Sequence, residues 1–486
     1  MNESTTPSRE PEPERTSEHA DKHRAELDPK LAQREAAFKE RYGEAYARGK
    51  APSGDLQAPY EDAYEDIAFP YSDSPMDYEG QGTWAKIKGA LANDIIAGLI
   101  LVALAIIALI VANSPIRDAY FALAHAEIGP AALGLHMSVQ HWAQDGILVI
   151  FFFAVGLELK EEFVNGSLHD PKTAAVPIIA AAFGMAGPAV VYCIVTAITG
   201  DGAWHGWAIP TATDIAFAVA ILQIFGRGMP LAARTFLLTL AVADDLGGII
   251  IIACFYSNGT LTTLLLNLAI AVAIAVVFSL VVRRGITKWW VLLPLGILCW
   301  YFMHRSGIHA TIAGVLLGMV VPAKVIGNDR ETMTEHLAES INPFSAGLAV
   351  PIFAFFAAGV NIVDAPGGAG AMLTQPVTLA VAFALPLGKF IGIFGSVSFM
   401  YALTPLNLGK GVNLRDIMPI SVVAGIGFTV ALLLSHLAFT GDELLTEAGS
   451  LGVVLGTFIS TILGAIFLRM RVKRIAAEHD AARSDS

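Results

Sequence analysis

The chain has little charge and very few cysteines for its length of 486 residues. Charged residues make up 15% of it and hydrophobic residues 55%, a balance expected where apolar side chains face lipid as well as a core. The three cysteines, Cys193, Cys254 and Cys299, lie in apolar segments without CxxC spacing, so neither a disulfide framework nor a cysteine metal site is indicated. This composition predicts an all-α polytopic membrane protein.

The acidic residues are concentrated at the N-terminus. Residues 1–83 hold 19 acidic and 10 basic residues, a net charge of −9 out of the total of −12. This segment has no apolar run that could offset its ordering entropy, so we expect a disordered acidic tail, with residues 29–49 as a candidate polar helix. The expected organisation is a cytoplasmic tail over 1–83, a transmembrane domain over 84–472 and a short cytoplasmic tail over 473–486.

Hydropathy predicts about twelve transmembrane helices, each roughly long enough for the ~20 residues that a bilayer requires. They lie near 91–113, 140–160, 175–199, 206–225, 234–256, 260–282, 289–303, 306–322, 345–363, 377–403, 416–438 and 451–469. An even number of spans puts both termini on the same side of the membrane.

The distribution of Lys and Arg predicts which side that is. The opposite loops carry only Arg117 and Arg305. The terminal side carries Lys86, Lys88, Lys160, Lys172, Arg227, Arg234, Arg283, Arg284, Lys288, Lys324, Arg330, Lys410, Arg415, Arg469, Arg471, Lys473 and Arg474. Because basic residues accumulate in cytoplasmic loops, both termini are expected in the cytoplasm.

Four ionisable residues fall far from any predicted helix end: Asp214, Asp244, Asp245 and Lys389. A charge at membrane depth costs several kcal/mol, so such residues by default indicate an ion or proton path. A lysine there needs a partner of opposite charge, and we expect Lys389 to pair with one of the aspartates. The alternative for the Asp244–Asp245 pair is a neutral, hydrogen-bonded aspartate that holds helices together.

Acidic residues also lie on the second predicted span. Glu158 and Glu162 are four residues apart and therefore share a helix face, where like charges interact. Asp145 belongs to the same span. The alternative is a solvated helix end, since Lys160 and Glu161 lie beside them.

The fourth and eleventh spans each contain an interruption. The fourth carries Pro210 and the cluster Thr211–Asp214, residues that favour helix caps over helix interiors. The eleventh carries Ala424–Thr429 with two glycines. Paired interruptions in two halves of a transporter are the sequence sign of a binding site made from broken helices, although a packing kink explains either one alone.

Six segments in register give the chain a close resemblance to bacterial NhaA-type sodium/proton antiporters. They are Phe152–Lys160, Ala212–Ala218, Asp244–Gly247, Ser306–Gly314, Gly388–Lys389 and Gly425–Thr429. The resemblance runs from about residue 90 to 472. It implies inverted repeats and two crossing broken helices, an architecture for which this family is itself a standard example.

The resemblance also implies roles for individual residues. Asp244 and Asp245 would bind sodium and protons in alternation, with Lys389 pairing to Asp244 when the cation is absent. Asp214 and Thr213 would lie where the broken helices cross, with Asp214 offsetting the positive helix N-termini and Lys389 the negative C-termini.

Further roles concern regulation and assembly. Glu158 and Glu162 match acids of the family that respond to pH on the cytoplasmic side. His309 matches a histidine linked to pH response, with a structural histidine packed between short helices as the alternative. The loop 114–139 matches the region that pairs in a homodimer. The long N-terminal tail has no counterpart, and the segment Lys324–Glu339 aligns poorly.

The expected function is a secondary active transporter in the bacterial plasma membrane, not an enzyme. It would extrude Na⁺, and also Li⁺, in electrogenic exchange for external protons, and so serve sodium and pH homeostasis. No cofactor and no nucleic-acid partner are expected. The alternative is a sodium-coupled symporter of an organic solute, since such transporters share the broken-helix architecture. Intramembrane aspartyl proteases and prenyltransferases need Gly-x-Gly-Asp or Asp-x-x-x-Asp motifs, which the chain lacks.

Overall fold

A computed structural model of the protein describes residues 94–166, 168–169, 171–256, 261–325, 332–403 and 413–484, together with Gly89 and Leu91. The chain divides into two units, Met1–Gln81 and Gly82–Ser486, and the described residues all belong to the second. The acidic tail and its candidate helix at 29–49 lie outside the described residues.

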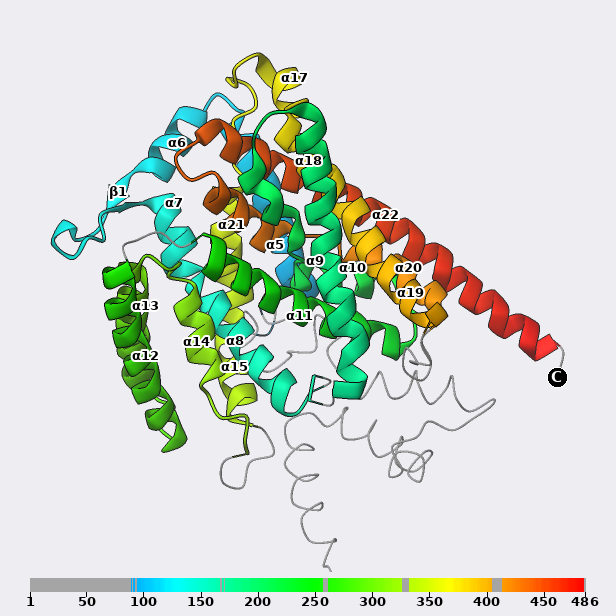
Figure 1. The fold of residues 1–486 in the computed structure, drawn as a ribbon, viewed down its shortest axis with the longest axis horizontal. Helices are drawn as coiled ribbons and strands as arrows, with labels where there is room; N and C mark the ends of the chain where they lie inside the picture. The colour runs from blue at the N-terminus through cyan, green and yellow to red at the C-terminus, as the bar shows by residue number, and fades with distance from the viewer. Residues whose placement is uncertain are drawn as a thin grey trace, which may run out of the picture. The chain divides into compact units, whose positions relative to one another are not determined.

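The first half of this unit is helical apart from one small hairpin (Figure 1). In chain order the elements are α5 (Asp94–Ala112), α6 (Arg117–His125), β1 (Glu127–Ile128), η1 (Ala131–Leu133), β2 (Met137–Ser138), α7 (Val139–His141), the π-helical turn η2 (Trp142–Ile147), α8 (Val149–Val164), α9 (Pro171–Thr199), the 3-10 helix η3 (Trp204–Thr211), α10 (Ile215–Phe225) and α11 (Leu231–Phe255). β1 and β2 pair antiparallel, with Glu127 opposite Ser138.

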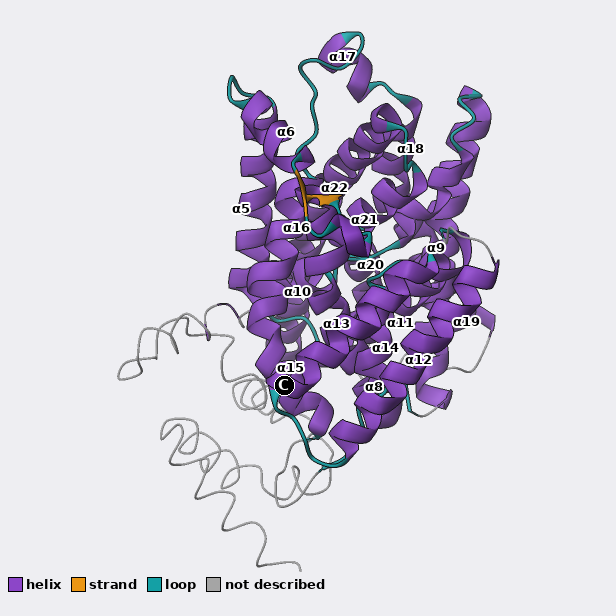
Figure 2. Ribbon diagram, turned by 90° about the vertical axis from the view of Figure 1, so that its left-hand side faces the viewer, coloured by secondary structure: helices purple, strands orange, loops and turns teal. Residues whose placement is uncertain are grey.

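Over its described residues, the second half consists of helices joined by loops, with one isolated antiparallel bridge between Val325 and Thr332. Its elements are α12 (Leu261–Arg283), α13 (Trp289–Ser306), α14 (Ile312–Met319), α15 (Met333–Phe344), η4 (Ser345–Ala349), α16 (Val350–Ala357), α17 (Gly368–Leu373), α18 (Pro376–Phe383), η5 (Ala384–Gly388), η6 (Phe390–Phe394), α19 (Gly395–Leu403), α20 (Leu414–Val423), α21 (Phe428–Ala438) and α22 (Glu443–Ser484). Figure 2 shows α6 and α17 at one end of the unit and α8 and α15 at the other.

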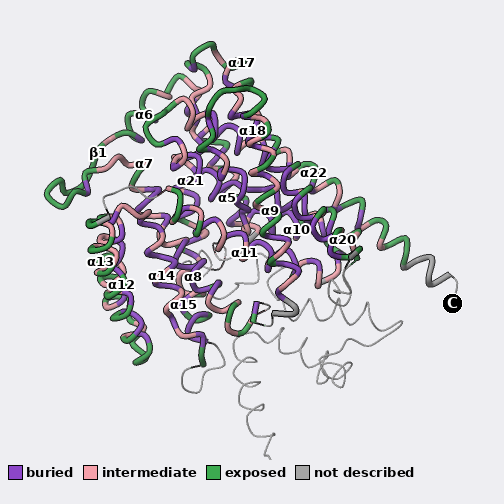
Figure 3. The backbone as a smooth tube through the Cα atoms, in the orientation of Figure 1, coloured by how far each residue is buried: buried purple, intermediate pink, exposed green. Residues whose placement is uncertain are grey.

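Several helices carry apolar side chains on their outer faces, as lipid-facing helices must. Leu266, Val276 and Leu280 on α12 are each more than half exposed, and Figure 3 shows the buried residues gathered around α5, α9, α11 and α21 instead. Among the described residues, seven helices are long and apolar enough to cross a bilayer, or nine if each of two bent helix pairs is one span. The protein is therefore a multi-pass membrane protein of helical class.

Individual spans differ from the hydropathy prediction in their bounds. The predicted helix at 306–322 is helical only over Ile312–Met319 and is shorter than a full span. The predicted span at 140–160 is made of α7, η2 and α8 in succession. The predicted span at 345–363 begins earlier, at Met333, and ends at Ala357. It begins there because the Thr332 hydroxyl accepts from the Glu335 N–H and the Glu335 carboxylate from the Thr332 N–H, a capping box that hydropathy does not register.

Two glycines allow the helical segment that carries Lys389 to cross α9 at close distance. A side chain at Gly388 would meet the backbone of Pro188 on α9, and one at Gly392 would meet the carbonyl oxygen of Phe183. The spacing Gly388–Gly392 is the small-residue pattern that lets membrane helices approach closely. Because the backbones lie this close, Lys389, next to Gly388, reaches across to α11.

Candidate functional site

Two bent helix pairs meet in the middle of the unit. The pair η3 and α10 bends by 43° at residues 212–214, and the pair α20 and α21 bends by 50° at residues 424–427. The two breaks touch, because the Asp214 N–H donates to the Ile426 carbonyl over 2.6 Å. A side chain at Gly427 would come within 2.7 Å of the Ala212 carbonyl oxygen, so this contact requires glycine.

Asp214 caps both helices that begin at these breaks. Its Oδ1 accepts from the Phe217 N–H at the start of α10 over 3.0 Å, and its Oδ2 accepts from the Thr429 N–H at the start of α21 over 3.1 Å. The N-terminus of a helix carries about half a positive charge, so one buried carboxylate compensates two helix ends. Asp214 is only 4% exposed.

Asp244 lies next to this crossing on α11 and pairs with Lys389. The Lys389 ammonium contacts Asp244 Oδ2, and both side chains are fully buried. The Thr213 hydroxyl lies 2.7 Å from the same Oδ2 and 2.8 Å from the Ala424 carbonyl oxygen, so it links Asp244 to both breaks. The pairing that the sequence predicted for Lys389 is therefore present, with Asp244 as its partner.

Asp245 is also buried, at 5% exposure, but has a different environment. Its Oδ1 has no hydrogen-bond partner among the described residues, and neither does Oδ1 of Asp244. The strongest like charge acting on it is that of its neighbour Asp244, followed by those of Asp214 and Glu158, whereas the Lys389 ammonium acts in the opposite sense. Two adjacent buried carboxylates thus present unengaged oxygens, which is the arrangement that suits a hard cation or a proton.

The oxygens that could hold a cation here belong to few side chains. Among the described residues, no group of three or more His, Cys, Asp and Glu side chains is arranged to hold a metal ion. The candidate ligands are therefore the carboxylates of Asp244 and Asp245, the Thr213 hydroxyl and the Ala424 carbonyl oxygen. A mixed set of this kind suits Na⁺, which accepts neutral oxygen ligands, better than a tightly bound transition metal.

The three residues linked to pH by the resemblance do not lie together. Glu158 is exposed and Glu162 half-buried on α8, and both interact with other parts of the protein. His309 lies instead beside Asp145, with 3.5 Å between its Nδ1 and Asp145 Oδ1. Thirteen residues separate Asp145 from Glu158, a helix length of roughly 20 Å. His309 and the two glutamates therefore occupy different ends of the α8 segment.

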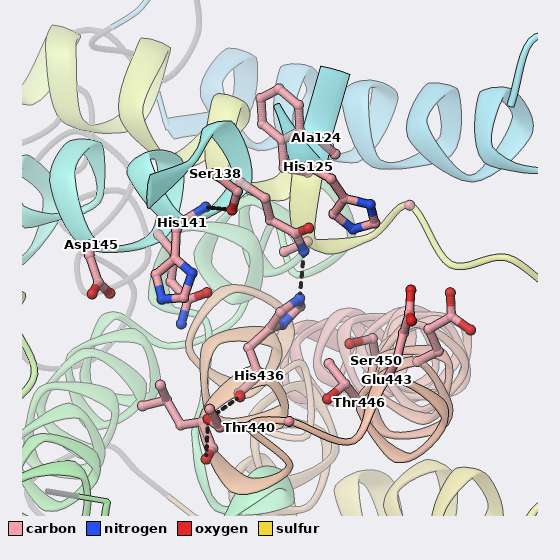
Figure 4. Close-up of a pocket in the computed structure, with 18 of the residues that line it drawn as sticks. Ala124, His125, Ser138, His141, Asp145, His436, Thr440, Glu443, Thr446 and Ser450 are labelled. Atoms are coloured by element: carbon pink, nitrogen blue, oxygen red, sulfur yellow. Dashed lines mark hydrogen bonds between the residues drawn. The ribbon is translucent and has the colours of Figure 1, made fainter. Parts of the chain in front are cut away.

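Asp145 faces a cavity of about 690 Å³ that sequence reasoning missed. Figure 4 shows His125, His141 and His436 around it, with Glu443 on α22 at the other side. The Gln140 amide lies 2.9 Å from His436 Nε2 and so joins α7 to the end of α21. With His304 and His309, the histidines that line the cavity come from five separate helices or loops, so no local spacing could have predicted the cluster.

The Thr429 N–H and the Ala424 carbonyl oxygen also belong to the site, and the amino-acid types at these positions could not have revealed them. Both are backbone groups, released from helical hydrogen bonding by the break. The one sequence signal for them was the Ala424–Thr429 interruption itself.

Comparison with known proteins places the chain in a family. Residues 88–468 match the family model described as Na⁺/H⁺ antiporter 1. The chain is 44% identical over 392 residues to the Na⁺/H⁺ antiporter NhaA of Streptomyces antibioticus, covering 80% of each chain. It is 44% identical to Na⁺/H⁺ antiporter NhaA 2 of Mycobacterium sp. (strain MCS), covering 82% of this chain and 91% of that one.

A third relative is Na⁺/H⁺ antiporter NhaA 3 of Streptomyces coelicolor, at 46% identity over 387 residues, covering 79% of this chain and 80% of that one. The matched residues include both helix breaks, Asp244, Asp245 and Lys389. The chain belongs to the Na⁺/H⁺ antiporter family of NhaA type.

Proposed function

We propose that this protein exchanges Na⁺ for protons across the membrane, with Asp244 and Asp245 as the oxygens that both ions share. The observation that carries the proposal is the pair of adjacent buried carboxylates, each with an oxygen free of hydrogen bonds among the described residues. The relatives at 44–46% identity bear the name Na⁺/H⁺ antiporter, which supports the same ions for this chain.

Competition for these oxygens couples the two fluxes. When Na⁺ binds, both aspartates are ionised, and the Lys389 ammonium gives up Oδ2 of Asp244 to the cation. Thr213 and the Ala424 carbonyl complete the set of oxygens, and Asp214 keeps the two helix N-termini neutralised throughout. When Na⁺ leaves, one proton neutralises Asp245 and a second returns to Lys389, which released it when Na⁺ bound, so that the ammonium pairs with Asp244 again. The site then crosses the membrane only with sodium or with protons.

The exchange is electrogenic if more than one proton returns for each sodium. One charge moved across 100 mV corresponds to about 2.3 kcal/mol, so an inside-negative potential drives sodium out. Li⁺ is also a hard cation with the same preference for oxygen, so it is expected as a second substrate. The physiological role that follows is sodium and pH homeostasis.

The proposal includes the topology expected from the sequence. It has twelve spans with inverted repeats, two of them broken, and both termini lie in the cytoplasm of a bacterium. The N-terminal tail ends at residue 83, the transmembrane domain covers residues 84–472, and the C-terminal tail begins at residue 473. Glu158, Glu162 and His309 are proposed to tune the response to pH. A homodimer would form through the loop 114–139, where Ile128 and Leu133 are each at least half exposed.

Purified protein in proteoliposomes tests the function. After a pH gradient is imposed, NaCl alone should collapse it, and the rate should increase when a permeant ion cancels the membrane potential that builds up. A sodium-coupled symporter is the alternative, because it shares the broken-helix architecture. A gradient that persists with sodium and collapses only when an organic solute is added would establish the symporter instead.

A further inference from the structure

A second cavity, of about 260 Å³, lies between α20 and α22 and is separate from the ion site. These two helices run side by side in Figure 1. The cavity wall combines the apolar side chains of Met418 and Met470 with three arginines, Arg415, Arg471 and Arg474. A pocket with apolar walls and several guanidinium groups is suited to a ligand that is both anionic and apolar.

The position of the cavity along α22 corresponds to the lipid headgroups. The apolar part of α22 ends at Leu468, and Arg469, Arg471, Lys473 and Arg474 follow directly. Basic residues at the end of an apolar span lie at the membrane–water interface, where the phosphates of the lipids are found.

The apolar wall of the cavity is open to the outside of the protein. Met418 is 36% exposed and Met470 47% exposed, and Phe467 also lines the cavity. These side chains continue the exposed apolar face of α22, which includes Ile466. An acyl chain can therefore lie along this face while its headgroup occupies the cavity.

The arginines differ in how far their charges are already compensated. Arg471 is 7% exposed, and its Nε donates to the fully buried Asp416 carboxylate over 2.6 Å, so Asp416 already compensates the charge of Arg471. Glu478 lies 3.7 Å from Arg415 and 3.5 Å from Arg471, contacts that are long and half exposed and therefore weak. Arg474 pairs with no carboxylate in the described part of the chain.

We propose that this cavity binds the headgroup of an anionic phospholipid, with the phosphate between Arg415 and Arg474 and an acyl chain along Met418 and Met470. Arg415 belongs to α20, whose far end carries the Ala424 carbonyl of the ion site, whereas Arg474 belongs to α22. A bound phosphate ties the start of α20 to α22. Anionic lipid thus holds one of the two bent helix pairs, a consequence for transport that rests on the proposed function.

Lipid binding is tested on the purified full-length protein in neutral detergent after removal of lipid. Thermal unfolding is followed during titration with phosphatidylglycerol, phosphatidylcholine or inorganic phosphate. Only phosphatidylglycerol should raise the melting temperature. The double variant Arg415→Gln/Arg474→Gln should bind it more weakly by about fivefold for each arginine, since each basic residue at the surface contributes about 1 kcal/mol.

Lys473→Gln is the matched control, because it removes one charge next to Arg474 from a residue that does not line the cavity. It should change the affinity by no more than about twofold, since Lys473 does not line the cavity and acts on a bound phosphate only through a charge interaction that salt screens. Met470→Trp is a second test, which narrows the mouth without a change in charge and should also weaken binding. Arg471 is left intact, so its ion pair with Asp416 on α20 is preserved.

Three results would overturn the proposal: equal stabilisation by phosphatidylcholine, stabilisation by inorganic phosphate, or an affinity that falls as much in Lys473→Gln as in the double variant. The transport consequence has its own readout. Exchange in proteoliposomes should be faster with phosphatidylglycerol than without it for the wild type, but not for the double variant. Selective lipid binding without any sodium/proton exchange would refute the proposed function and leave the lipid site standing.

Discussion

Replacing Asp244 by Asn should destabilise the protein, whereas replacing Asp245 by Asn should not. Asp244 is the buried partner of Lys389, which is itself fully buried. Removing one partner of a buried ion pair costs about 3–5 kcal/mol, because the other charge is left uncompensated. Asp245 has an oxygen without a hydrogen bond among the described residues and is repelled above all by its neighbour Asp244, so its neutralisation relieves repulsion.

The expected difference in melting temperature follows from this energy. One kcal/mol corresponds to about 2–4 °C for a domain of 150–250 residues and to less for a longer chain. We therefore expect Asp244→Asn to unfold about 5 °C below Asp245→Asn in the same detergent. The double variant Asp244→Asn/Lys389→Gln serves as control, since it removes both charges and should recover most of the loss.

Thermal unfolding followed by intrinsic tryptophan fluorescence measures these differences at a pH where exchange is active. A melting temperature of Asp244→Asn equal to or above that of Asp245→Asn would refute the pairing as a stabilising contact. Failure of the double variant to recover stability would show that Asp244 acts through Thr213 and the helix breaks instead of through Lys389.

Four further predictions concern transport. Asp245→Asn should lose both sodium binding and sodium-driven proton release while remaining folded, and near-normal exchange would remove Asp245 from the site. The apparent affinity for sodium should fall roughly tenfold for each unit of decreasing pH where one proton is displaced, because ligand oxygens must be deprotonated to bind a cation. It is measured as the half-saturating sodium concentration in proteoliposomes, and an affinity that does not change with pH would exclude competition. Glu158→Gln/Glu162→Gln should shift the curve of activity against pH at saturating sodium by a measurable fraction of a unit, since the two acids share a helix face, and an unshifted curve would favour a solvated helix end. Deletion of residues 1–80 should leave sodium-driven proton flux nearly intact, and loss of transport in a protein that still inserts would show that the tail is required.

The sequence was sufficient to predict the charged residues of the site but not the way they are held. Asp214, Asp244, Asp245 and Lys389 stand out because charge at membrane depth is costly. The residues alone left open which aspartate pairs with Lys389, and only the family resemblance implied Asp244, because the choice depends on the glycine crossing of α9 with the segment around Gly388, a tertiary contact. Likewise, the double cap by Asp214 needs two breaks far apart in sequence to meet.

The ends of helices were predicted well where long apolar runs continue to those ends. They were missed where side-chain caps determine the first residue of a helix. α5 and α11 lie close to their predicted bounds because apolar residues continue to the helix ends. α15 begins at Met333, inside a segment read as a cytoplasmic loop, because Thr332 and Glu335 cap it. The approach of His309 to Asp145 also escaped prediction, since it joins residues 164 positions apart.

Proton release on sodium binding tests the central claim most directly. Purified protein in a weakly buffered detergent solution is mixed with NaCl at a pH where the site is partly protonated, and the pH of the solution is recorded with choline chloride as control. If sodium and protons share Asp244 and Asp245, sodium should acidify the solution, and Asp245→Asn should abolish the signal. Saturable sodium binding without proton release at any pH would contradict the account.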